Sequence, residues 1–444
     1  MSVVVVIGAG PMGLAAAYQA LKGGHQVQVL EAGPIAGGMS AHFDFGGLSL
    51  ERFYHFVCRG DVPTFELLKE LGIDDQLRWV RTSMGLFLGG SLHPWGNPLA
   101  LLRFPGVTLL TKLRYGLLGM TCTLRKSWPA LENITAKEWL IDWCGQEGYD
   151  KLWRPLFDLK FYEFSSTVSA AWMWARMRRA WRSRSSPMQE ELGYIAGGSA
   201  TLVDALVTSI TNLGGCIHLS SPVRKVVVEQ GHTVGVDTSA GFFPADHVIS
   251  TIPLPHVPAM VPDFPDDLKF RYRSIDSIGI CCVILKLRRA VSPHFWVNLS
   301  GVPHDVPGII EFSNLRPLGA HVVYIPYYMP LSNKKFSWTD DQFIEDAFAC
   351  VLLVNPSLNR SDLLDATVSR LRYAQAVCPP GFASKLPPVQ TQIAGLQAAD
   401  TSSYYPEDRS IAESVQLGRK MAESLRADGV ELSNLSEKQT IVAL

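Results

Sequence analysis

The sequence predicts an α/β fold built on a parallel sheet, and three neighbouring features near the N-terminus indicate it. Residues 3–7 form a short β-branched run that is typical of a strand buried on both faces. The run leads into a glycine-rich turn at 8–13, and residues 14–22 are rich in alanine and leucine, as expected of a helix. An alternating segment at 25–30 then ends in an acid, Glu31. Together these features form a compact β-α-β unit of the Rossmann type.

Each glycine of the turn has a physical role in such a unit. Gly8 allows the tight turn out of the strand, and Gly10 lets a pyrophosphate approach the backbone without a Cβ in the way. Gly13 lets the helix pack closely on the strand, while the helix N-terminus offers N–H groups to phosphates. Glu31 lies 18 residues past Gly13, near the spacing expected of an acid that binds ribose hydroxyls. That acid would repel the 2′-phosphate of NADP.

Length and composition set wider limits. The chain has 444 residues, which suggests two to three domains. With 47% hydrophobic and 18% charged residues it has material for a large core and is not expected to be disordered. A formal net charge of −1 gives no reason to expect nucleic-acid binding.

The eight cysteines and the N-terminus exclude other classes. No two cysteines form a C-x-x-C pair, so no metal site is predicted, and a disulfide framework is not expected without a secretion signal. Residues 1–7 lack a positive leading region and run into the glycine turn, unlike a signal peptide. No apolar run of about 18 residues is present, so no spanning helix is expected. These features predict a cytoplasmic protein.

A second glycine pair, Gly37-Gly38, follows soon after Glu31. It resembles the extended fingerprint of a flavoprotein superfamily that includes amine oxidases, protoporphyrinogen oxidases, phytoene desaturases and UDP-galactopyranose mutases. The resemblance implies FAD as the cofactor, with this loop approaching its diphosphate. The superfamily usually has arginine after the pair, whereas this chain has Met39, so one phosphate contact has to come from elsewhere.

Three later stretches resemble the same superfamily. Residues 193–199 resemble its return into the FAD domain, and the strand expected at 221–228 would bring the backbone amide of Val223 to the adenine ring. Residues 248–253 resemble the strand that leaves the domain.

Residues 395–400 and 404–411 resemble the closing FAD motif of this superfamily, and a helix is expected after them from about Ala412 to Leu425. The resemblance implies that Asp400 contacts the ribityl–phosphate region and that the helix after Ser410 points its N-terminus at the flavin. Asp400 has an alternative role as a turn or N-cap residue, and Ala399 replaces the usual glycine. The cofactor-binding residues implied are Gly8, Gly10, Pro11, Met12, Gly13, Glu31, Ala32, Gly37, Gly38, Met39, Val223, Asp400, Ser410 and Ile411.

These segments predict a discontinuous Rossmann-type FAD-binding domain made of residues 1–57, 192–255 and 386–428. Residues 58–191 are expected to form a mostly helical subdomain, and 256–385 a mixed α+β substrate domain with strands at 278–287 and 321–328. The tail after Asp428 is polar until its last residues and is expected to be loosely ordered.

Two stretches of the helical subdomain suggest surface contacts. Residues 99–124 are apolar but interrupted by cations, so they could lie in a membrane interface, although we expect an ordinary buried helix pair. Residues 172–184 interleave aromatic residues with arginines. This segment could meet anionic lipid or an anionic substrate such as a nucleotide-sugar or carboxylate, although a solvated helix face is the simplest expectation.

Residues near the expected flavin are the candidates for catalysis. Glu51 to Phe56 follow the glycine pair, and in relatives this part of the chain passes close to the isoalloxazine ring. Tyr54 and His55 are therefore the candidate catalytic residues, with a structural role as the alternative for the histidine. Further residues of the second domain could line the substrate pocket, although half of them are expected to be core: 294–296, Glu311, Asn314 and 324–328.

The resemblance implies an FAD-dependent oxidoreductase that passes hydride from a substrate C–H to flavin N5, because flavin supplies the difficult chemistry. The substrate is a small molecule with a C–H next to nitrogen or at a future C=C bond. A mutase-like isomerase acting on a nucleotide-sugar is the first alternative, favoured by residues 172–184 and 405–409. A non-catalytic nucleotide-binding protein is the second.

Overall fold

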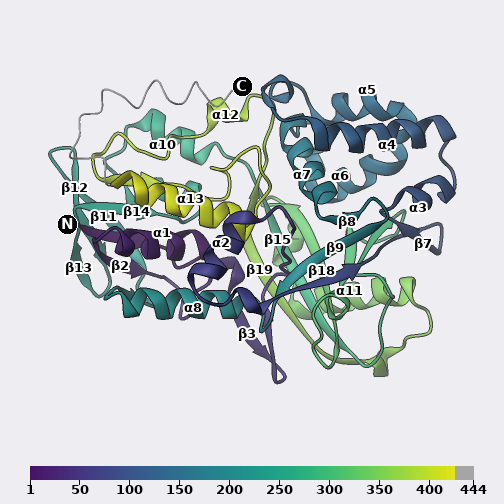
Figure 1. The fold of residues 1–444 in the computed structure, drawn as a ribbon, viewed down its shortest axis with the longest axis horizontal. Coiled ribbons are helices and arrows are strands. Elements are labelled where there is room, and N and C mark those ends of the chain that lie inside the picture. The colour runs from purple at the N-terminus through teal and green to yellow at the C-terminus, as the bar shows by residue number, and fades with distance from the viewer. Residues whose placement is uncertain (426–444) are drawn as a thin grey trace.

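The computed structural model describes residues 1–425, which fold into a parallel-sheet region, a large mixed sheet and a group of helices (Figure 1). The first region contains a five-stranded sheet in which every pairing is parallel. Its strands come from the start, the middle and the end of the chain. In spatial order they are β10 (Cys216–His218), β2 (Gln26–Leu30), β1 (Val3–Ile7), β14 (His247–Ser250) and β20 (Leu396–Ala398).

Helices cover this sheet, and the first of them begins where the glycine turn ends. Helix α1 runs from Pro11 to Lys22, starting before the predicted 14–22, because proline is favoured at the first helical position. A Cβ on Gly13 would lie 1.9 Å from the carbonyl oxygen of Gly8, so the close packing predicted for this glycine is present. The other helices of this region are α8 (Ser199–Asn212), α13 (Ile411–Ser424) and α2 (Val62–Glu70).

The second large sheet has seven strands and is mixed, as the predicted α+β part requires. The strands predicted at 278–287 and 321–328 are present as β15 (Ser277–Leu287) and β18 (His321–Pro330). Helix α11 (Asp340–Val354) packs against this sheet. The other strands are β19 (Leu363–Ala376), β17 (Gly308–Glu311), β16 (Trp296–Ser300), β6 (Met84–Leu88) and β7 (Ser91–Trp95).

The expectation that residues 58–191 are mostly helical needs a correction. Strands β6 and β7 belong to the seven-stranded sheet, because β6 pairs in parallel with β16. A separate antiparallel sheet contains β5 (Leu77–Thr82), β9 (Gln189–Ile195) and β8 (Arg184–Ser186). The helices themselves gather at the end of the molecule away from α1 (Figure 1). They are α3 (Pro98–Arg103), α4 (Leu109–Leu124), α5 (Ala136–Gly148), α6 (Arg154–Phe161) and α7 (Ala170–Arg182).

Smaller elements connect these parts. A hairpin follows the second glycine pair, and a three-stranded antiparallel sheet follows α8. Short helices lie between β14 and β15 and before β20. Residues 426–428 of the predicted FAD domain, and the tail after Asp428, lie outside the described residues. The elements are β3 (His42–Phe45), β4 (Leu48–Glu51), β11 (Val223–Glu229), β12 (His232–Thr238), β13 (Gly241–Pro244), α9 (Val257–Met260), α10 (Asp266–Arg273) and α12 (Phe382–Lys385).

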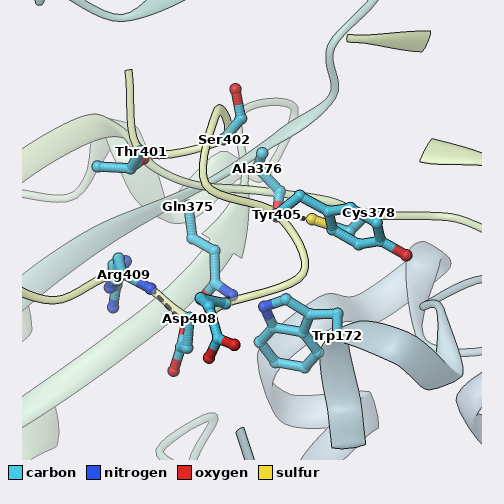
Figure 2. A pocket seen from close by; sticks show the side chains of 10 residues that line it. Trp172, Gln375, Ala376, Cys378, Thr401, Ser402, Tyr405, Asp408 and Arg409 are labelled. Atoms are coloured by element: carbon cyan, nitrogen blue, oxygen red, sulfur yellow. Dashed lines mark hydrogen bonds between the residues drawn. The ribbon is translucent and has the colours of Figure 1, made fainter. Parts of the chain in front are cut away.

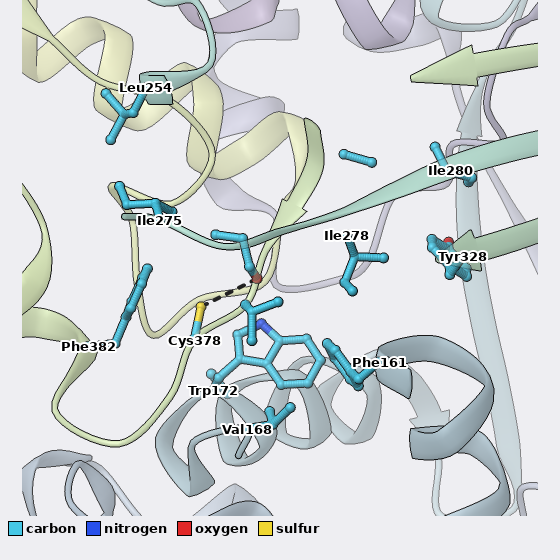
Figure 3. Packing of buried hydrophobic residues seen from close by; sticks show 14 of the residues in the cluster. Phe161, Val168, Trp172, Leu254, Ile275, Ile278, Ile280, Tyr328, Cys378 and Phe382 are labelled. Carbon is cyan, nitrogen blue, oxygen red and sulfur yellow. Dashed lines mark hydrogen bonds between the residues drawn. The ribbon is translucent and has the colours of Figure 1, made fainter. Parts of the chain in front are cut away.

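One hydrophobic core joins the helices to the seven-stranded sheet. Trp172 on α7 lies beside Phe161 of α6, and both belong to the same buried cluster as Ile278 of β15 and Tyr328 of β18 (Figure 3). The rings of Phe161 and Trp172 meet edge to face at 5.4 Å between centroids. This packing fixes the helices against the sheet at the point where the closing motif returns.

Candidate functional site

The glycine turn lies at the carboxyl end of β1. Gly8 has φ +100°, a left-handed conformation that favours glycine. Gly10 is the N-cap of α1 with no capping side chain, and the first turn contains no acid. A Cβ on Gly10 would meet its nearest atom only at 3.9 Å, so that position is open on the outside. Uncapped N–H groups beside an open glycine fit a diphosphate.

Glu31 is held at the same edge of the sheet by two backbone amides. Its Oε2 accepts a hydrogen bond from Ala9 N, and its Oε1 accepts one from Gly33 N, each at 2.8 Å. A carboxylate has about four acceptor positions, so capacity for ribose hydroxyls remains. Ser221 N donates to Glu31 O at 2.8 Å, which brings the start of β11, at Val223, to this edge.

The second glycine pair lies against the first. A Cβ on Gly38 would lie 3.1 Å from the Cα of Gly10, and Gly37 N donates to Ala9 O at 2.8 Å. Gly37 and Gly38 both have positive φ, and a short helix covers Gly38–Ser40. The two glycine turns, 29 residues apart in sequence at Gly8 and Gly37, therefore form one surface.

The closing motif reaches the same sheet through β20. Asp400 accepts hydrogen bonds from Leu254 N and Ser402 N, each at 2.8 Å, and from Ser402 Oγ at 2.5 Å. Burial raises the pKa of its carboxyl, although these hydrogen bonds act in the opposite direction. Asp400 therefore stabilises a turn, which is the alternative role that the sequence suggested for it. Ser410 is the N-cap of α13 and accepts from Glu413 N at 3.1 Å.

Among the described residues, the predicted cofactor contacts therefore gather at one edge of the parallel sheet, and their chemistry fits FAD. They offer uncapped helix N–H groups, a ribose-type acid and glycines where backbones approach closely. Met39 is half-buried and Ala32 exposed. Met39 stands at the position where the superfamily usually has an arginine. Among the contacts described at the glycine turns, no other cation takes the place of that arginine.

The two candidate catalytic residues lie behind this edge. The Tyr54 hydroxyl is 2.7 Å from that of Tyr328, and its ring meets Trp296 edge to face at 5.5 Å. Burial is the main cause that raises the pKa of Tyr54. His55 Nε2 lies 3.5 Å from Ser40 Oγ, and burial lowers the pKa of the imidazole, which favours its neutral form.

The second-domain candidates divide by the alternation of strands β16 and β18. Tyr324 and Tyr328 face Tyr54, whereas Tyr327 faces α11 and donates to Asp346 Oδ2 at 2.7 Å. Glu311 is buried and accepts from Val291 N at 2.8 Å. More than half of this set is core, because Phe295, Tyr324, Ile325, Tyr327 and Tyr328 all belong to buried hydrophobic clusters.

A pocket lies between α7, the end of β19 and the closing motif (Figure 2). It is small, with a volume of about 10 Å³, which is room for about one water molecule. Asp408 accepts hydrogen bonds there from Arg409 N at 3.0 Å and from Arg176. The lining residues are Trp172, Gln375, Ala376, Cys378, Thr401, Ser402, Tyr405, Glu407, Asp408 and Arg409.

Helix α7 is not a solvated face, which corrects the simplest expectation for residues 172–184. Arg176 pairs with Asp408, and Arg178 pairs with Glu407. Arg179 donates to both carboxylate oxygens of Asp61 at 2.9 and 3.2 Å. Three arginines of α7 are thus neutralised, one by Asp61, the residue before α2, and two by acids of the closing motif.

The expectation of a buried helix pair at 99–124 is wrong for one face of α4. Six of its apolar side chains are between 53% and 71% exposed: Leu109, Leu110, Leu113, Leu117, Met120 and Leu124. They recur at helical spacing, and only the opposite face, with residues such as Leu118, is buried. No helix within residues 1–425 is long and apolar enough to cross a bilayer.

Comparison with known proteins agrees with this geometry. The profile of flavin containing amine oxidoreductases matches residues 13–352. The chain belongs to the flavin-containing amine oxidoreductase family. Membership confirms the predicted superfamily and FAD as the cofactor, and it confirms the assignment of the chain to FAD-dependent oxidoreductases at the level of the family.

Two relatives carry the name of zeta-carotene desaturase. A Synechococcus elongatus protein named "Probable zeta-carotene desaturase" is 26% identical over 268 residues, 55% of this chain and 54% of that one. The zeta-carotene desaturase of Zea mays is 24% identical over 299 residues, 58% and 51%. The chain therefore matches about half the length of each of these relatives.

Two solved structures show the same fold over nearly the whole chain. Reduced UDP-galactopyranose mutase superposes with a TM-score of 0.74 at 15% identity, covering 97% of both chains. Putrescine oxidase bound to putrescine superposes with a TM-score of 0.69 at 17% identity, covering 96% of this chain and 99% of the other. These likenesses confirm the predicted fold class.

Proposed function

We propose that this family member is an FAD-dependent oxidoreductase that oxidises a small molecule by hydride transfer. Both glycine turns, Glu31 and the closing motif lie at one edge of the parallel sheet, and this arrangement supports the proposal. Buried tyrosine side chains lie behind that edge. Residues 1–57, 192–255 and 386–428 would act as the FAD-binding domain, 58–191 as the helical subdomain and 256–385 as the substrate domain. Bound FAD would supply the hydride acceptor.

In this proposal the predicted cofactor residues divide the binding work. The N-terminus of α1, with Gly10 to Gly13, receives the diphosphate, and Glu31 receives the ribose hydroxyls. The backbone of Val223 meets the adenine. Ser410 and Ile411 place the positive end of α13 at the flavin, where the helix dipole favours negative charge on the reduced ring.

On the substrate side, Tyr54 and His55 would orient the substrate. Both are enclosed by protein, and the wall of Tyr54, Trp296 and Tyr324 is apolar apart from its hydroxyls. Such a wall excludes water and suits a substrate C–H next to nitrogen or at a future C=C bond.

The test begins with an absorbance spectrum of the purified protein before and after acid precipitation. A flavin spectrum that moves into the supernatant is expected, and it would identify non-covalent FAD. Anaerobic mixing with amines, polyenes and porphyrinogens should then bleach the flavin with one of these classes. A colourless protein that takes up no added FAD would overturn the cofactor assignment, and a flavin that none of them reduces would count against the oxidase reaction.

The sequence features that favoured a mutase-like isomerase support it less strongly in the folded chain. Arg176 pairs with Asp408 and Arg178 with Glu407, so fewer cations of residues 172–184 remain for a nucleotide diphosphate. Turnover of a nucleotide-sugar by prereduced protein, without net electron transfer, would restore it.

We further propose a cytoplasmic protein in peripheral contact with a membrane through residues 99–124, not through 172–184. The support is the exposed apolar face of α4, continued on α3 by Leu99 and Leu102, which are 43% and 51% exposed. Residues 98–131 contain five cations and no acid, which suits an anionic lipid surface. The cytoplasmic location rests on sequence features alone.

Sedimentation with vesicles tests this contact. The protein should bind vesicles containing phosphatidylglycerol more strongly than pure phosphatidylcholine vesicles. The double variant Leu113→Ser, Leu117→Ser should lose most of this binding, whereas the control Leu213→Ser, exposed on the far side of the molecule after α8, should keep it. No binding by the unaltered protein, or dimers in light scattering that the double variant abolishes, would contradict the proposal.

A further inference from the structure

Three side chains form a hydrogen-bonded series that ends at the candidate residue Tyr54. Nη2 of Arg409 donates to the Tyr328 hydroxyl at 3.2 Å, and that hydroxyl lies 2.7 Å from the Tyr54 hydroxyl. Arg409 is itself held in place, because its Nη1 donates to Ala374 O at 2.6 Å. A guanidinium group can donate but cannot accept a hydrogen bond. The oxygen of Tyr328 is therefore the acceptor for Arg409.

The two tyrosine hydroxyls have one proton more than their contacts use. Each hydroxyl carries one proton, and the single hydrogen bond between Tyr54 and Tyr328 uses one of the two. Among residues 1–425, no other group accepts a hydrogen bond from either hydroxyl. One O–H group of this pair is therefore free to donate to a molecule outside the protein chain.

Burial decides which of the two tyrosines keeps the free proton. Tyr328 is 5% exposed, whereas Tyr54 is half-buried. If Tyr54 donated to Tyr328, the proton of Tyr328 would be left without an acceptor in the interior, and an unsatisfied buried donor is costly. The favoured direction therefore runs from Arg409 through Tyr328 to Tyr54, and the O–H of Tyr54 is the free donor.

The positive charge at the start of this series is not cancelled by a carboxylate bound to the same guanidinium. Both described hydrogen bonds from the Arg409 side chain go to uncharged oxygens. Asp408 accepts a hydrogen bond from the backbone amide of Arg409 at 3.0 Å, but its ion pair is with Arg176. The guanidinium of Arg409 therefore keeps positive charge beside Tyr328.

This charge strengthens the free donor and makes it selective. A cation that donates to Tyr328 polarises the Tyr328 O–H, and in such a chain each hydrogen bond strengthens the next. Lys160 lies on the same side, with its Nζ 5.2 Å from the ring centroid of Tyr328, although burial lowers the pKa of this amine. The charge behind Tyr328 repels a cationic group at Tyr54.

The surroundings of Tyr54 favour an uncharged acceptor. Its ring meets Trp296 edge to face at 5.5 Å and Tyr324 at 6.1 Å between centroids. A carboxylate beside these rings would need a charged partner of its own, whereas Arg409 reaches Tyr54 only through Tyr328. An ammonium group has donors alone and cannot accept from Tyr54. A carbonyl oxygen accepts hydrogen bonds and carries no net charge, so it fits this position.

We propose that Tyr54 donates a hydrogen bond to a carbonyl oxygen of the substrate, and that Tyr328 and Arg409 are positioning residues that orient and strengthen this donor. The inference rests on the proposed function, since it names the class of substrate that the oxidoreductase would take. The substrate is then a carbonyl compound, and an alkylamine that is protonated at neutral pH is disfavoured.

Infrared difference spectroscopy of acetophenone with a ¹³C-labelled carbonyl tests the inference in the flavin-loaded protein. The C=O stretch of the bound ketone should lie at lower frequency than in an apolar solvent, because the carbonyl accepts a hydrogen bond. Tyr54→Phe should abolish this shift and weaken binding about three- to tenfold. Tyr328→Phe should give a smaller shift, since Tyr54 keeps its proton but loses the charge behind it. Tyr327→Phe, on the opposite face of β18 where the hydroxyl donates to Asp346, is the matched control and should leave the shift unchanged.

Titration followed by flavin absorbance adds a comparison of ligands. The amine 1-phenylethylamine has the carbon skeleton of acetophenone with an ammonium group in place of the carbonyl. It should bind about tenfold more weakly than acetophenone, and Tyr54→Phe should reduce this preference.

The outcomes separate this inference from the cofactor assignment. A flavin-loaded protein that binds neither compound, or prefers the amine, overturns the carbonyl site and leaves FAD untouched, as does an unchanged C=O stretch in Tyr54→Phe. A colourless protein overturns FAD binding, whereas the stretch of the bound ketone can still be recorded, because it needs no flavin signal. Circular dichroism of each variant excludes loss of fold as the cause of lost binding.

Discussion

At the scale of single residues, the tightest steric constraint lies at Gly13. A Cβ there would lie 1.9 Å from Gly8 O and 2.9 Å from the Thr251 hydroxyl, and the first of these is backbone that cannot move aside cheaply. Gly13→Ala should therefore shift α1, cost about 1–3 kcal/mol of stability or more, and abolish flavin retention. The ratio of flavin to protein absorbance and urea unfolding measure both effects.

Gly116→Ala is the matched control for that prediction. Gly116 lies in α4, where an added Cβ meets nothing within 4 Å, so alanine should stabilise the helix by about 1 kcal/mol. Equal flavin content in the two variants would show that the close approach at Gly13 is unimportant.

Glu413 gives a pH-dependent prediction. Burial, then Glu407 and Asp61, raise the pKa of its carboxyl from 4.5 to about 7. Below pH 4.5 the Glu413 carboxyl is neutral in both the folded and the unfolded protein, so its burial costs no stability there. The penalty develops between pH 4.5 and about 7 and is complete above that. Glu413→Gln should therefore be more stable than the unaltered protein above pH 7, by about 1–3 kcal/mol, and equal to it near pH 4.5.

Thermal melting across pH 4.5–8 measures this difference. Glu423→Gln on the same helix is exposed and should show a constant, small difference at every pH. A Glu413→Gln curve parallel to that of the unaltered protein would contradict the buried-carboxyl interpretation.

Residues also show where sequence reasoning ends. Tyr54 was predicted beside the flavin because it follows a recognisable glycine pair, and its partner Tyr328 was identified only as one of several second-domain tyrosines. The contacts of Lys160 with the rings of Phe161, Trp172 and Tyr328 could not be predicted, because α6, α7 and β18 meet only in the folded chain.

At the scale of elements, α7 joins three parts of the molecule through its arginines. Arg179 reaches Asp61, and that acid also accepts from Cys58 N at 2.9 Å. The side chains of Arg179 and Asp61 are 21% and 8% exposed. Arg179→Met would leave Asp61 without its counter-charge and should cost about 2–3 kcal/mol, less than a fully buried pair.

Urea unfolding of Arg179→Met beside Arg182→Met measures this cost. Arg182 is exposed on the same helix, and its loss should change stability by less than about 0.5 kcal/mol. Equal values for the two variants would support the solvated helix face that the sequence suggested.

Helix α4 shows a second limit of sequence reasoning at this scale. Its apolar residues and scattered cations fit both a buried helix and an interfacial one, since periodicity marks an apolar face without showing what covers it. The structure decides the matter by packing Leu118 and Cys122 inward and leaving Leu113 and Leu117 outside.

At the scale of the whole molecule, local patterns predicted the β-α-β unit and the strands of the second domain well, because each rests on residues close in sequence. The pairing of β6 with β16 was missed, because it joins segments more than 200 residues apart and no turn signal connects them. The discontinuous FAD domain was predicted only because its separate pieces each resemble a known motif.

A buried ion pair joins the hairpin that follows the second glycine pair to the region of the seven-stranded sheet. Glu51 ends β4, next to the second glycine turn, and its Oε2 lies 3.2 Å from Nη1 of Arg316, which follows β17. The same carboxylate accepts from Ser199 N at 2.7 Å, and Tyr324 donates to Glu51 O at 2.8 Å. The side chains of Glu51 and Arg316 are 3% and 9% exposed, so the pair is almost fully desolvated.

Without this ion pair, the flavin site should unfold at lower urea than the rest of the protein. Arg316→Met leaves a buried carboxylate at the start of α8 and should cost about 3–5 kcal/mol. Because Glu51 positions the segment that leads to Tyr54, flavin should be released before the mixed sheet unfolds. Flavin fluorescence, which reports release, should therefore rise at lower urea than the tryptophan transition, whereas the two should coincide in the unaltered protein and in the exposed control Arg288→Met. Coincident transitions at an unchanged midpoint would mean that the hairpin is held to the seven-stranded sheet mainly by apolar contacts, and that this ion pair adds little to their coupling.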